Sequence, residues 1–180
     1  ALYSKSRVNK AGEWFRENIS VRGDRYYGPR TKDWTDEQIT AFFDGFDENV
    51  AVIEHWRATH QQPLTTAAMG LRSMCDTADC DALVSQRLKR MPTIVDKLRR
   101  ENGMALSRMH DLGGCRAVVA SITDLRAAQA RIEKNGRQRD PWTRDYIESP
   151  KPSGYRGVHL IVEYRERWIE VQLRTEIQHA

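Results

Sequence analysis

The chain has 180 residues, of which 39% are hydrophobic, and its 29 Lys and Arg against 25 Asp and Glu give a formal net charge of +4. This is enough apolar material for a single domain with a real core, and no apolar run approaches the roughly 18 residues that cross a bilayer, so we expect a soluble chain that does not enter a membrane. The three cysteines are an odd number without zinc-site spacing, so we expect neither a disulfide framework nor a zinc site, and a reducing cytoplasm as the location.

The first part of the chain, residues 1–83, is predicted to be helical. Residues 2–20 have the character of a short helix, and a connection that contains Gly and Tyr follows it. A capping box formed by Thr35 and Gln38 opens a long amphipathic helix that ends before Pro63. The apolar positions of this helix are Ile39, Phe42, Phe43, Phe46, Val50 and Ile53.

The stretch 81–101 keeps apolar residues at helical spacing, but Pro92 interrupts it, so two helices that meet at "KRMP" are predicted. The second helix has Pro92 in its first turn, where free backbone N–H groups attract anions. Between residues 87 and 100 only Asp96 opposes the cations, which indicates either a solvated basic face or a docking place for an anion. The cations are Arg87, Lys89, Arg90, Lys97, Arg99 and Arg100.

After Arg108 the pattern changes to alternating strands and helix. "CRAVVA" predicts a short buried strand, and a helix capped by Thr123 and closed by Gly136 follows it. A polar segment, residues 137–157, separates this unit from two strands, "VHLIVEY" and "WIEVQLRT".

The last two strands can be aligned if residues 165–166 form a two-residue turn. His159 then faces Gln172, and Glu170 lies two residues away on the same face of the second strand. Directly opposed residues have Cβ atoms about 4.5–5.5 Å apart, so this face could gather an acid, a base and an amide. A bulged three-residue turn would break this parity, and the sequence leaves the turn type open.

"MHDLGGCR" places Asp111 and two glycines just before the first strand, with Arg116 inside it. An acid beside glycines can hold magnesium while a phosphate approaches the backbone, although Asp is more often a helix cap or a solvated loop residue. The pair His110 and Asp111 also occurs in HD phosphohydrolases, but suitable partner residues are absent, so a hydrolase is rejected.

The segment "DYIESPKPSGYRGVH" contains two prolines and two glycines, which favour a fixed loop. Its cations and its aromatic ring suit a nucleotide, while a rigid surface loop with a packed Tyr is the alternative. The displayed side chains are Arg144, Lys151, Tyr155, Arg156 and His159.

Together these segments resemble the synthetase domain of the RelA/SpoT alarmone synthetases. The resemblance covers residues 84–179, while residues 1–83 match only through "YSKSRVNKAG" and their helical character. Four motifs occur in the order of the family: Arg87, Lys89, Thr93 and Lys97 in the basic segment; Asp111, Gly114 and Arg116 in "DLGGCR"; the loop segment; and "EVQLRT".

The resemblance implies an α+β fold, with a mixed β-sheet flanked by helices as in nucleotidyltransferases. It also implies transfer of the β,γ-pyrophosphate of ATP to the 3′-hydroxyl of GDP or GTP, with Mg²⁺ held by Asp111 and Glu170. Glu170 is also the candidate proton acceptor. The implied ATP-binding residues are Arg87, Lys89, Thr93, Lys97 and Arg116. The implied acceptor-binding residues are Arg144, Lys151, Tyr155, His159, Gln172 and Arg174, and among them Tyr155 is implied to stack on the base.

One departure concerns the acceptor. Gly157 stands where many family members have Ser, so a polar contact is missing. The toxic small members of the family are similar as well, and they imply tRNA, pyrophosphorylated at its 3′-CCA end, as the alternative acceptor, with an antitoxin as partner; Arg99 and Arg100 are then candidates to contact its stem. An inactive nucleotide-sensing module is the third alternative. No hydrolase domain fits in this length, and the end at Ala180, inside an expected helix, leaves open whether the natural chain continues.

Overall fold

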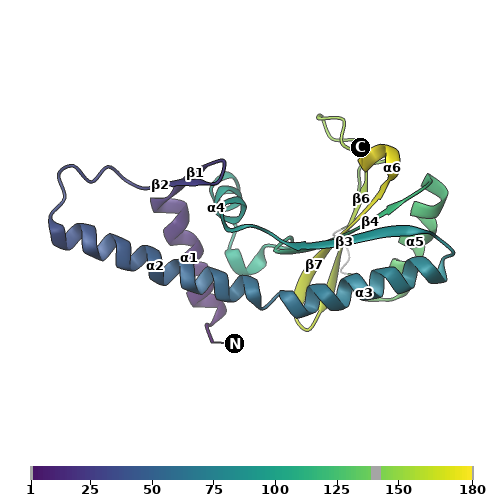
Figure 1. Cartoon of the computed structure of the whole chain (residues 1–180), viewed down its shortest axis with the longest axis horizontal. Coiled ribbons are helices and arrows are strands. Elements are labelled where there is room, and N and C mark those ends of the chain that lie inside the picture. Colours follow the sequence, from purple (N-terminus) through teal and green to yellow (C-terminus); the bar gives the residue numbers. More distant parts are fainter. Residues whose placement is uncertain (1, 139–142, 180) are drawn as a thin grey trace. The chain divides into compact units, whose positions relative to one another are not determined.

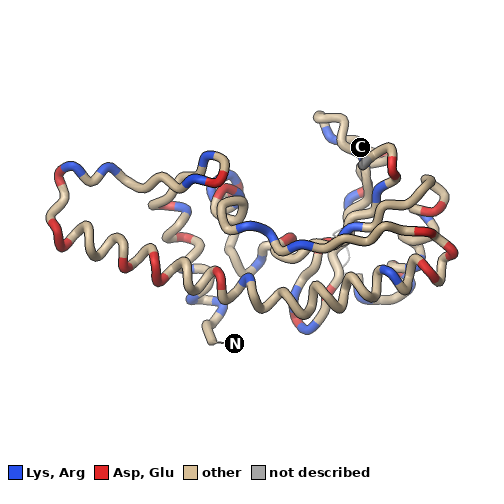
Figure 2. The backbone as a smooth tube through the Cα atoms, in the orientation of Figure 1, with Lys and Arg blue, Asp and Glu red and all other residues tan. Residues whose placement is uncertain are grey.

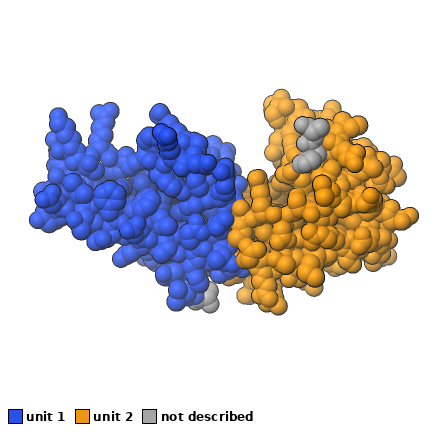
Figure 3. Space-filling model, in the orientation of Figure 1, with its two compact units in different colours: residues 1–59, 89–109 blue, residues 60–88, 110–180 orange. Residues whose placement is uncertain are grey.

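The computed structural model describes residues 2–138 and 143–179 and consists of two compact units (Figure 1, Figure 3). Unit 1 contains residues 1–59 and 89–109, and unit 2 contains residues 60–88 and 110–180. Within the described ranges, no helix combines the length and the apolar character needed to cross a membrane.

Unit 1 is mainly helical. Its elements are α1 (Lys5–Asn18), β1 (Ser20–Arg22), β2 (Arg25–Tyr27), α2 (Asp36–Ala58), α4 (Met91–Arg100) and the 3₁₀ turn η1 (Leu106–Arg108). The predicted capping box of α2 is confirmed, because the Thr35 side chain accepts from the Gln38 amide and the Gln38 side chain accepts from the Thr35 amide. The connection after α1 forms a short hairpin, β1–β2, that the sequence did not predict; Gly23 at its turn has φ 61°.

Helices α1 and α4 are joined by two arginines that satisfy each other's helix ends. The last carbonyl groups of a helix have no intrahelical donor and attract cations. Arg16 of α1 donates through Nε to the Leu98 carbonyl at 2.8 Å and through Nη2 to the Met104 carbonyl. Arg99 of α4 donates in return to the carbonyls of Arg16 at 2.7 Å and Ile19 at 2.9 Å. Arg99 is therefore engaged inside unit 1, whereas Arg100 pairs with Asp96 on the exposed face of α4.

Unit 2 is built on a five-stranded mixed sheet, which confirms the predicted fold class. The strand order is β3-β4-β7-β6-β5, in which β4 and β7 are parallel and the other neighbours are antiparallel. The elements are α3 (Gln61–Thr77), β3 (Ala82–Leu88), β4 (Gly113–Val119), α5 (Ile122–Lys134), β5 (Arg144–Asp145), β6 (Val158–Tyr164), β7 (Arg167–Thr175) and α6 (Glu176–His179).

Two predictions in this region are wrong. The first of the two helices expected in residues 81–101 is instead β3, which pairs with β4 along its whole length. The apolar spacing of this segment also suits a helix, but its seven paired positions with β4 favour the strand. Backbone pairing satisfies every donor and acceptor on the side of β3 that faces β4. The cap of α5 is Ser121, not Thr123, since Ser121 forms a capping box with Asp124. Gly136 does follow the end of α5, with φ 73°.

The register predicted for the last hairpin is confirmed. Arg165 and Glu166 form the two-residue turn with φ of 48° and 59°, as a type I′ turn requires. Tyr164 consequently faces Arg167, and His159 faces Gln172.

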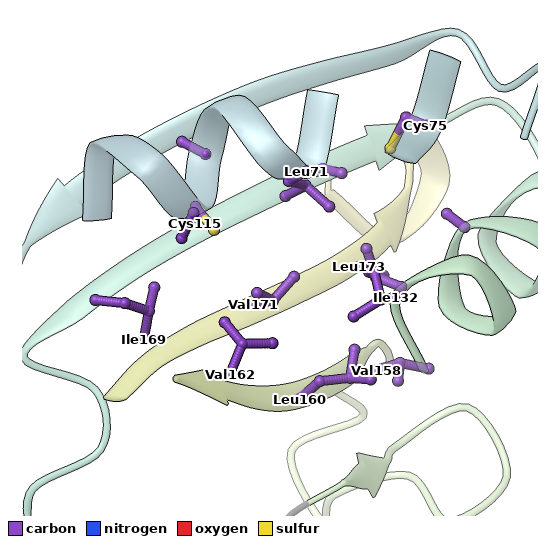
Figure 4. Packing of buried hydrophobic residues seen from close by; sticks show 14 of the residues in the cluster. Leu71, Cys75, Cys115, Ile132, Val158, Leu160, Val162, Ile169, Val171 and Leu173 are labelled. Carbon is purple, nitrogen blue, oxygen red and sulfur yellow. The ribbon is translucent and has the colours of Figure 1, made fainter. Parts of the chain in front are cut away.

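The helices α3 and α5 cover one face of this sheet. The core of unit 2 lies between the sheet and these two helices (Figure 4). Alternate residues of β4, β6 and β7, such as Val171 and Leu160, point into it. The three cysteines are free and buried among these apolar side chains, where burial raises the pKa of Cys75 to about 11 and that of Cys115 to about 12. The cysteines therefore act as small core residues. The polar groups of the sheet lie on its opposite face.

We predict that Arg16→Met lowers the free energy of unfolding by about 1–2 kcal/mol, because it keeps the stem of the side chain and leaves the Leu98 carbonyl at the end of α4, and the Met104 carbonyl in the segment after it, without this donor. Urea denaturation followed by circular dichroism measures the difference. Arg100→Met is the matched control; it removes an exposed pair with Asp96 and should change stability by less than about 0.5 kcal/mol. Equal effects of the two changes would contradict the capping role of Arg16.

Candidate active site

The open face of the sheet in unit 2 carries rows of polar residues that cross neighbouring strands. Directly paired residues of neighbouring strands point to the same face. One row crosses all five strands and consists of Ser85, Arg116, Gln172, His159 and Arg144. In the adjacent row Gly114 lies between Arg87 of β3 and Glu170 of β7. A Cβ built on Gly114 would come no closer than 3.8 Å to another heavy atom, the Glu170 carbonyl oxygen, so there is space above this glycine.

Five side chains of this face form a closed ring of hydrogen bonds. Arg174 donates to the Tyr155 hydroxyl at 3.1 Å, and this hydroxyl lies 2.6 Å from His159 Nε2. The other ring nitrogen of His159 lies 2.9 Å from Glu170 Oε1. Gln172 donates to Glu170 Oε2 at 2.7 Å and accepts from Arg174 at 3.1 Å. Both oxygens of the Glu170 carboxylate are thus held by neighbours on the sheet, and the ring brings together five of the residues predicted from the sequence.

Glu170 is an ionised carboxylate in a largely buried place. Its side chain is 19% exposed and that of His159 is 14% exposed. Burial raises the pKa of Glu170, but the hydrogen bond and the charge of His159, together with the hydrogen bond from Gln172, lower it by more. The net pKa lies below the ordinary value, so the carboxylate is charged and acceptor-only at neutral pH.

Three arginines gather next to this carboxylate. The pKa of Arg116 is lowered by burial and then by the positive charges of Arg174 and Arg87. Arg116 and Arg174 both direct guanidinium nitrogens at Gln172 Oε1, at 3.4 and 3.1 Å. Cations that repel one another beside an open space form a site for a polyanion.

The loop between β5 and β6 presents Tyr155 and Lys151 to the site. Lys151 Nζ lies 4.4 Å from the ring centre of Tyr146 and 5.1 Å from that of Tyr155. Tyr146 in turn packs edge-to-face against Tyr155 and His159, with ring centres 5.7 and 5.2 Å apart. Arg156 lies in the same loop, and its guanidinium is directed at the Ile147 carbonyl at 3.4 Å.

Asp145 anchors the beginning of this loop. Its carboxylate accepts from the amides of Ile147 and Glu148 at 3.0 and 3.2 Å, as in an Asx turn, and forms an ion pair with Arg126 of α5. The sequence did not predict this pair or the position of Tyr146. The Asx-turn spacing in "DYIE" was the available signal for Asp145.

Asp111 lies in the turn before β4, close enough to Glu170 for its charge to raise the Glu170 pKa. Among the residues that the structure describes, no group of three or more His, Cys, Asp or Glu side chains could hold a metal ion. The pair Asp111 and Glu170 still fits magnesium, because this ion is usually bound by one or two carboxylates and completes its coordination with water and substrate phosphates.

The remaining predicted residues belong to unit 1. Basic residues follow one another along the backbone from the end of β3 into α4 (Figure 2). Lys89 lies before α4, and its carbonyl accepts from Arg57 at 2.7 Å. Thr93 lies in the first turn of α4 after Pro92, which confirms the predicted helix start, and Lys97 lies in the last turn, 3.8 Å from Glu101.

Residues 86–180 match the family model described as the region found in RelA / SpoT proteins. The GTP pyrophosphokinase YwaC of Bacillus subtilis is 31% identical over 102 residues, which cover 49% of each chain. The GTP pyrophosphokinase of Escherichia coli K12 is 26% identical over 134 residues, which cover 73% of this chain and 18% of that protein. The chain thus spans about half or less of the length of these curated relatives.

Solved structures give the same fold. Small alarmone synthetase 1 from Bacillus subtilis, bound to its product pppGpp, matches with a TM-score of 0.63 and 22% identity, over 70% of this chain and 73% of that one. Small alarmone synthetase 2 from the same organism matches with a TM-score of 0.59 and 24% identity, over 70% of this chain and 73% of that one. At this level of identity the likeness establishes the fold.

We predict that Asp145→Asn lowers the free energy of unfolding at neutral pH by about 1 kcal/mol, because it removes the charge that pairs with Arg126. Burial raises the pKa of Asp145, and its hydrogen bonds lower it by more, to a value below 3.8. Stability from a carboxylate with a depressed folded pKa is present above the unfolded pKa and is lost as the pH falls through the folded value.

The difference between wild type and Asp145→Asn should therefore shrink as the pH falls below 3.8, which denaturation curves at a series of pH values measure. Glu148→Gln is the control, since Glu148 is 75% exposed and lies 3.7 Å from Arg126. A pH-independent difference for Asp145→Asn would show that its charge is not what anchors the loop.

Proposed function

The chain belongs to the RelA/SpoT family, and from this we propose that it transfers the β,γ-pyrophosphate of ATP to the 3′-hydroxyl of GDP or GTP, making (p)ppGpp. The observation that carries the proposal is the ionised Glu170, held by a ring of hydrogen bonds beside three arginines. Two relatives bear the name GTP pyrophosphokinase, and a neighbour in structure binds pppGpp as its product.

In this proposal Glu170 accepts the proton of the attacking 3′-hydroxyl. A carboxylate has about four lone-pair positions, and the contacts with His159 and Gln172 use two of them. The lowered pKa keeps the group ionised, and its two partners fix its orientation. General base catalysis depends on such positioning and contributes about 10²–10⁴-fold to rate.

The arginines bind the transferred phosphates. Phosphoryl-type transfer proceeds with little covalent help from the protein and depends on in-line positioning and neutralisation of charge. Arg87 pairs with Gly114 across β3 and β4, and Arg116 pairs with Gln172 across β4 and β7. Gly114 leaves space here for a phosphate to approach the backbone. Lys89, Thr93 and Lys97 are assigned to ATP by the family resemblance.

Asp111 and Glu170 are the residues that would hold magnesium. The bound ion supplies neutralisation of charge on the phosphate oxygens of the donor. Each oxygen of the Glu170 carboxylate has a second lone pair, so the contact with Gln172 would remain in place with the ion held there.

The loop residues bind the acceptor. Tyr155 offers the aromatic surface for the base, and the cations of Lys151 and Arg174 lie against its ring. Arg144, on β5, pairs with His159 of β6. In the structure the Arg174 guanidinium lies 4.6 Å from the ring centre of Tyr155, so cations cover the ring before a base stacks on it. A stacked base replaces at least one cation–π contact, each of which contributes about 0.5–1 kcal/mol at an exposed site.

Incubation with ATP labelled in its γ-phosphate tests the proposal, with GDP, GTP or bulk tRNA as acceptor and with added magnesium. Labelled (p)ppGpp is the expected product. Label in tRNA and none in guanosine nucleotides would replace the proposal by the tRNA alternative.

We predict that Glu170→Gln lowers kcat at least about a hundredfold, because the amide keeps the shape of the side chain and removes the charge that accepts the proton. Product formation under saturating substrates measures kcat, and circular dichroism verifies the fold. Glu166→Gln, in the exposed turn between β6 and β7, is the control and should keep the wild-type rate. Near-normal turnover by Glu170→Gln would remove Glu170 from the reaction.

We predict that Arg87→Ala and Lys97→Ala each raise the KM for ATP about tenfold and change the KM for the acceptor by less than about twofold. Both side chains are assigned to the donor phosphates. Initial rates with one substrate varied at a time give the two constants, and Lys134→Ala, at the exposed end of α5, is the control. Equal effects on both substrates would indicate a general electrostatic contribution.

A further inference from the structure

The acceptor loop, residues 146–157 between β5 and β6, begins at a very short strand. β5 consists of Arg144 and Asp145, which pair with His159 and Val158 of β6, whereas β6 itself has seven residues. Strands in globular proteins usually have about three to ten residues, and a segment with few backbone hydrogen bonds opens locally. The position of the loop therefore depends on an anchor outside this strand.

Consecutive residues at the start of the loop point to opposite faces of the sheet. Arg144 and Tyr146 point to the open face, where the ring centre of Tyr146 lies 5.2 Å from that of His159. Asp145, between them, points to the face that α5 covers, and its carboxylate pairs there with Arg126. A contact behind the sheet thus fixes two neighbouring residues in front of it.

Arg126 is itself held in place for this contact. Its Nη1 donates to Gln129 Oε1 at 2.7 Å, one turn further along α5, and Gln129 donates in turn to Glu133 at 2.9 Å. The side chains of Arg126 and Asp145 are 34% and 20% exposed, so water screens this pair less than a fully exposed one. Glu148, 3.7 Å from the same guanidinium, is 75% exposed and contributes less. The contact with Asp145 is therefore the anchor.

The anchored segment supports side chains that are assigned to the acceptor. The ring of Tyr146 packs edge-to-face against that of Tyr155, with ring centres 5.7 Å apart. Lys151 Nζ lies 4.4 Å from the ring centre of Tyr146 and is thereby held beside Tyr155. A shift of Asp145 would move Tyr146, its neighbour in the chain, and both acceptor side chains would lose their support.

We propose that Arg126, which lies outside the four sequence motifs, is a positioning residue for acceptor binding. Its contact with Asp145 fixes the place of Tyr146. The ring of Tyr146 in turn supports Tyr155 and Lys151, which bind the acceptor. The geometry of the acceptor surface is thus set from the opposite face of the sheet. The effect on the acceptor rests on the proposed function, whereas the anchoring of the loop does not.

Hydrogen exchange measured by mass spectrometry tests the anchor without any substrate. Arg126→Met keeps the stem of the side chain and removes the guanidinium. Peptides that cover residues 144–149 should then exchange about fivefold faster, because the amides of Ile147 and Glu148 bond to the carboxylate that Arg126 fixes. Arg131→Met, the same change at an exposed position of α5, is the control and should leave this exchange unchanged. Unchanged exchange in Arg126→Met would overturn the proposal.

Kinetics test the consequence for the acceptor. Arg126→Met should raise the KM of GDP about fivefold, while kcat and the KM of ATP change by less than about twofold. Arg126→Lys keeps the charge without the forked donor and should restore part of the acceptor affinity. An unchanged acceptor KM together with lower thermal stability would make the pair purely structural and overturn the positioning role.

The two measurements also separate this proposal from the proposed function. Failure of the wild type to use GDP or GTP would overturn the proposed function, and the exchange rates would still decide whether Arg126 holds the loop. If tRNA is labelled instead, the KM of tRNA takes the place of the KM of GDP, and the same rise is expected. An unchanged KM of tRNA would overturn the positioning role.

A double-mutant cycle tests the route through Asp145. Asp145→Asn keeps an oxygen for the Asx turn and removes the charge that pairs with Arg126. The rise in acceptor KM caused by Arg126→Met should therefore be smaller in the Asp145→Asn background. Glu148→Gln, at the exposed partner, is the matched control background and should leave that rise unchanged. Additive effects of Arg126→Met and Asp145→Asn would overturn the proposed route.

Discussion

Burial of one charged carboxylate determines much of the arrangement of unit 2. An ionised group that leaves water must be hydrogen-bonded, since an unpaired buried charge is strongly destabilising. Glu170 meets this requirement through His159 on the neighbouring strand and Gln172 on its own strand. The contact with His159 depends on strand register, because a shift of one residue between β6 and β7 would move His159 to the face opposite Glu170. The two-residue turn at Arg165 and Glu166 fixes that register.

The local character of this hairpin explains why it could be predicted from the sequence. Alternation of polar and apolar residues and the length of the turn lie within one short segment, so His159, Glu170 and Gln172 were correctly placed on one face. β3 could not be predicted in the same way. The apolar residues of β3 also suit a helix. The strand conformation depends on pairing with β4, which begins only at Gly113, farther along the chain. The choice between the two is made by long-range pairing.

The site itself shows the same division. The residue types of the polar face and of the loop could be read from their motifs, but the direction of individual side chains could not. Tyr155 was expected to offer its ring, and its hydroxyl also turns into the ring of hydrogen bonds. Arg126 reaches the loop from α5, and no local pattern connects the two segments. Arg99 belongs to a basic run, yet its guanidinium binds helix-end carbonyls.

The arginine cluster gives the physical link between fold and function. Arg87, Arg116 and Arg174 repel one another, and burial adds to the effect on Arg116, so the free protein holds three cations in an unfavourable arrangement. Gln172 offsets part of this repulsion, because its carbonyl oxygen accepts from two of the guanidinium groups while its amide donates to Glu170. Gln172 thus holds two guanidinium groups and the carboxylate together on one face of the sheet. In the proposed function a phosphate chain meets cations that are already in place, so binding needs little reorganisation, which is how preorganised charge lowers a barrier.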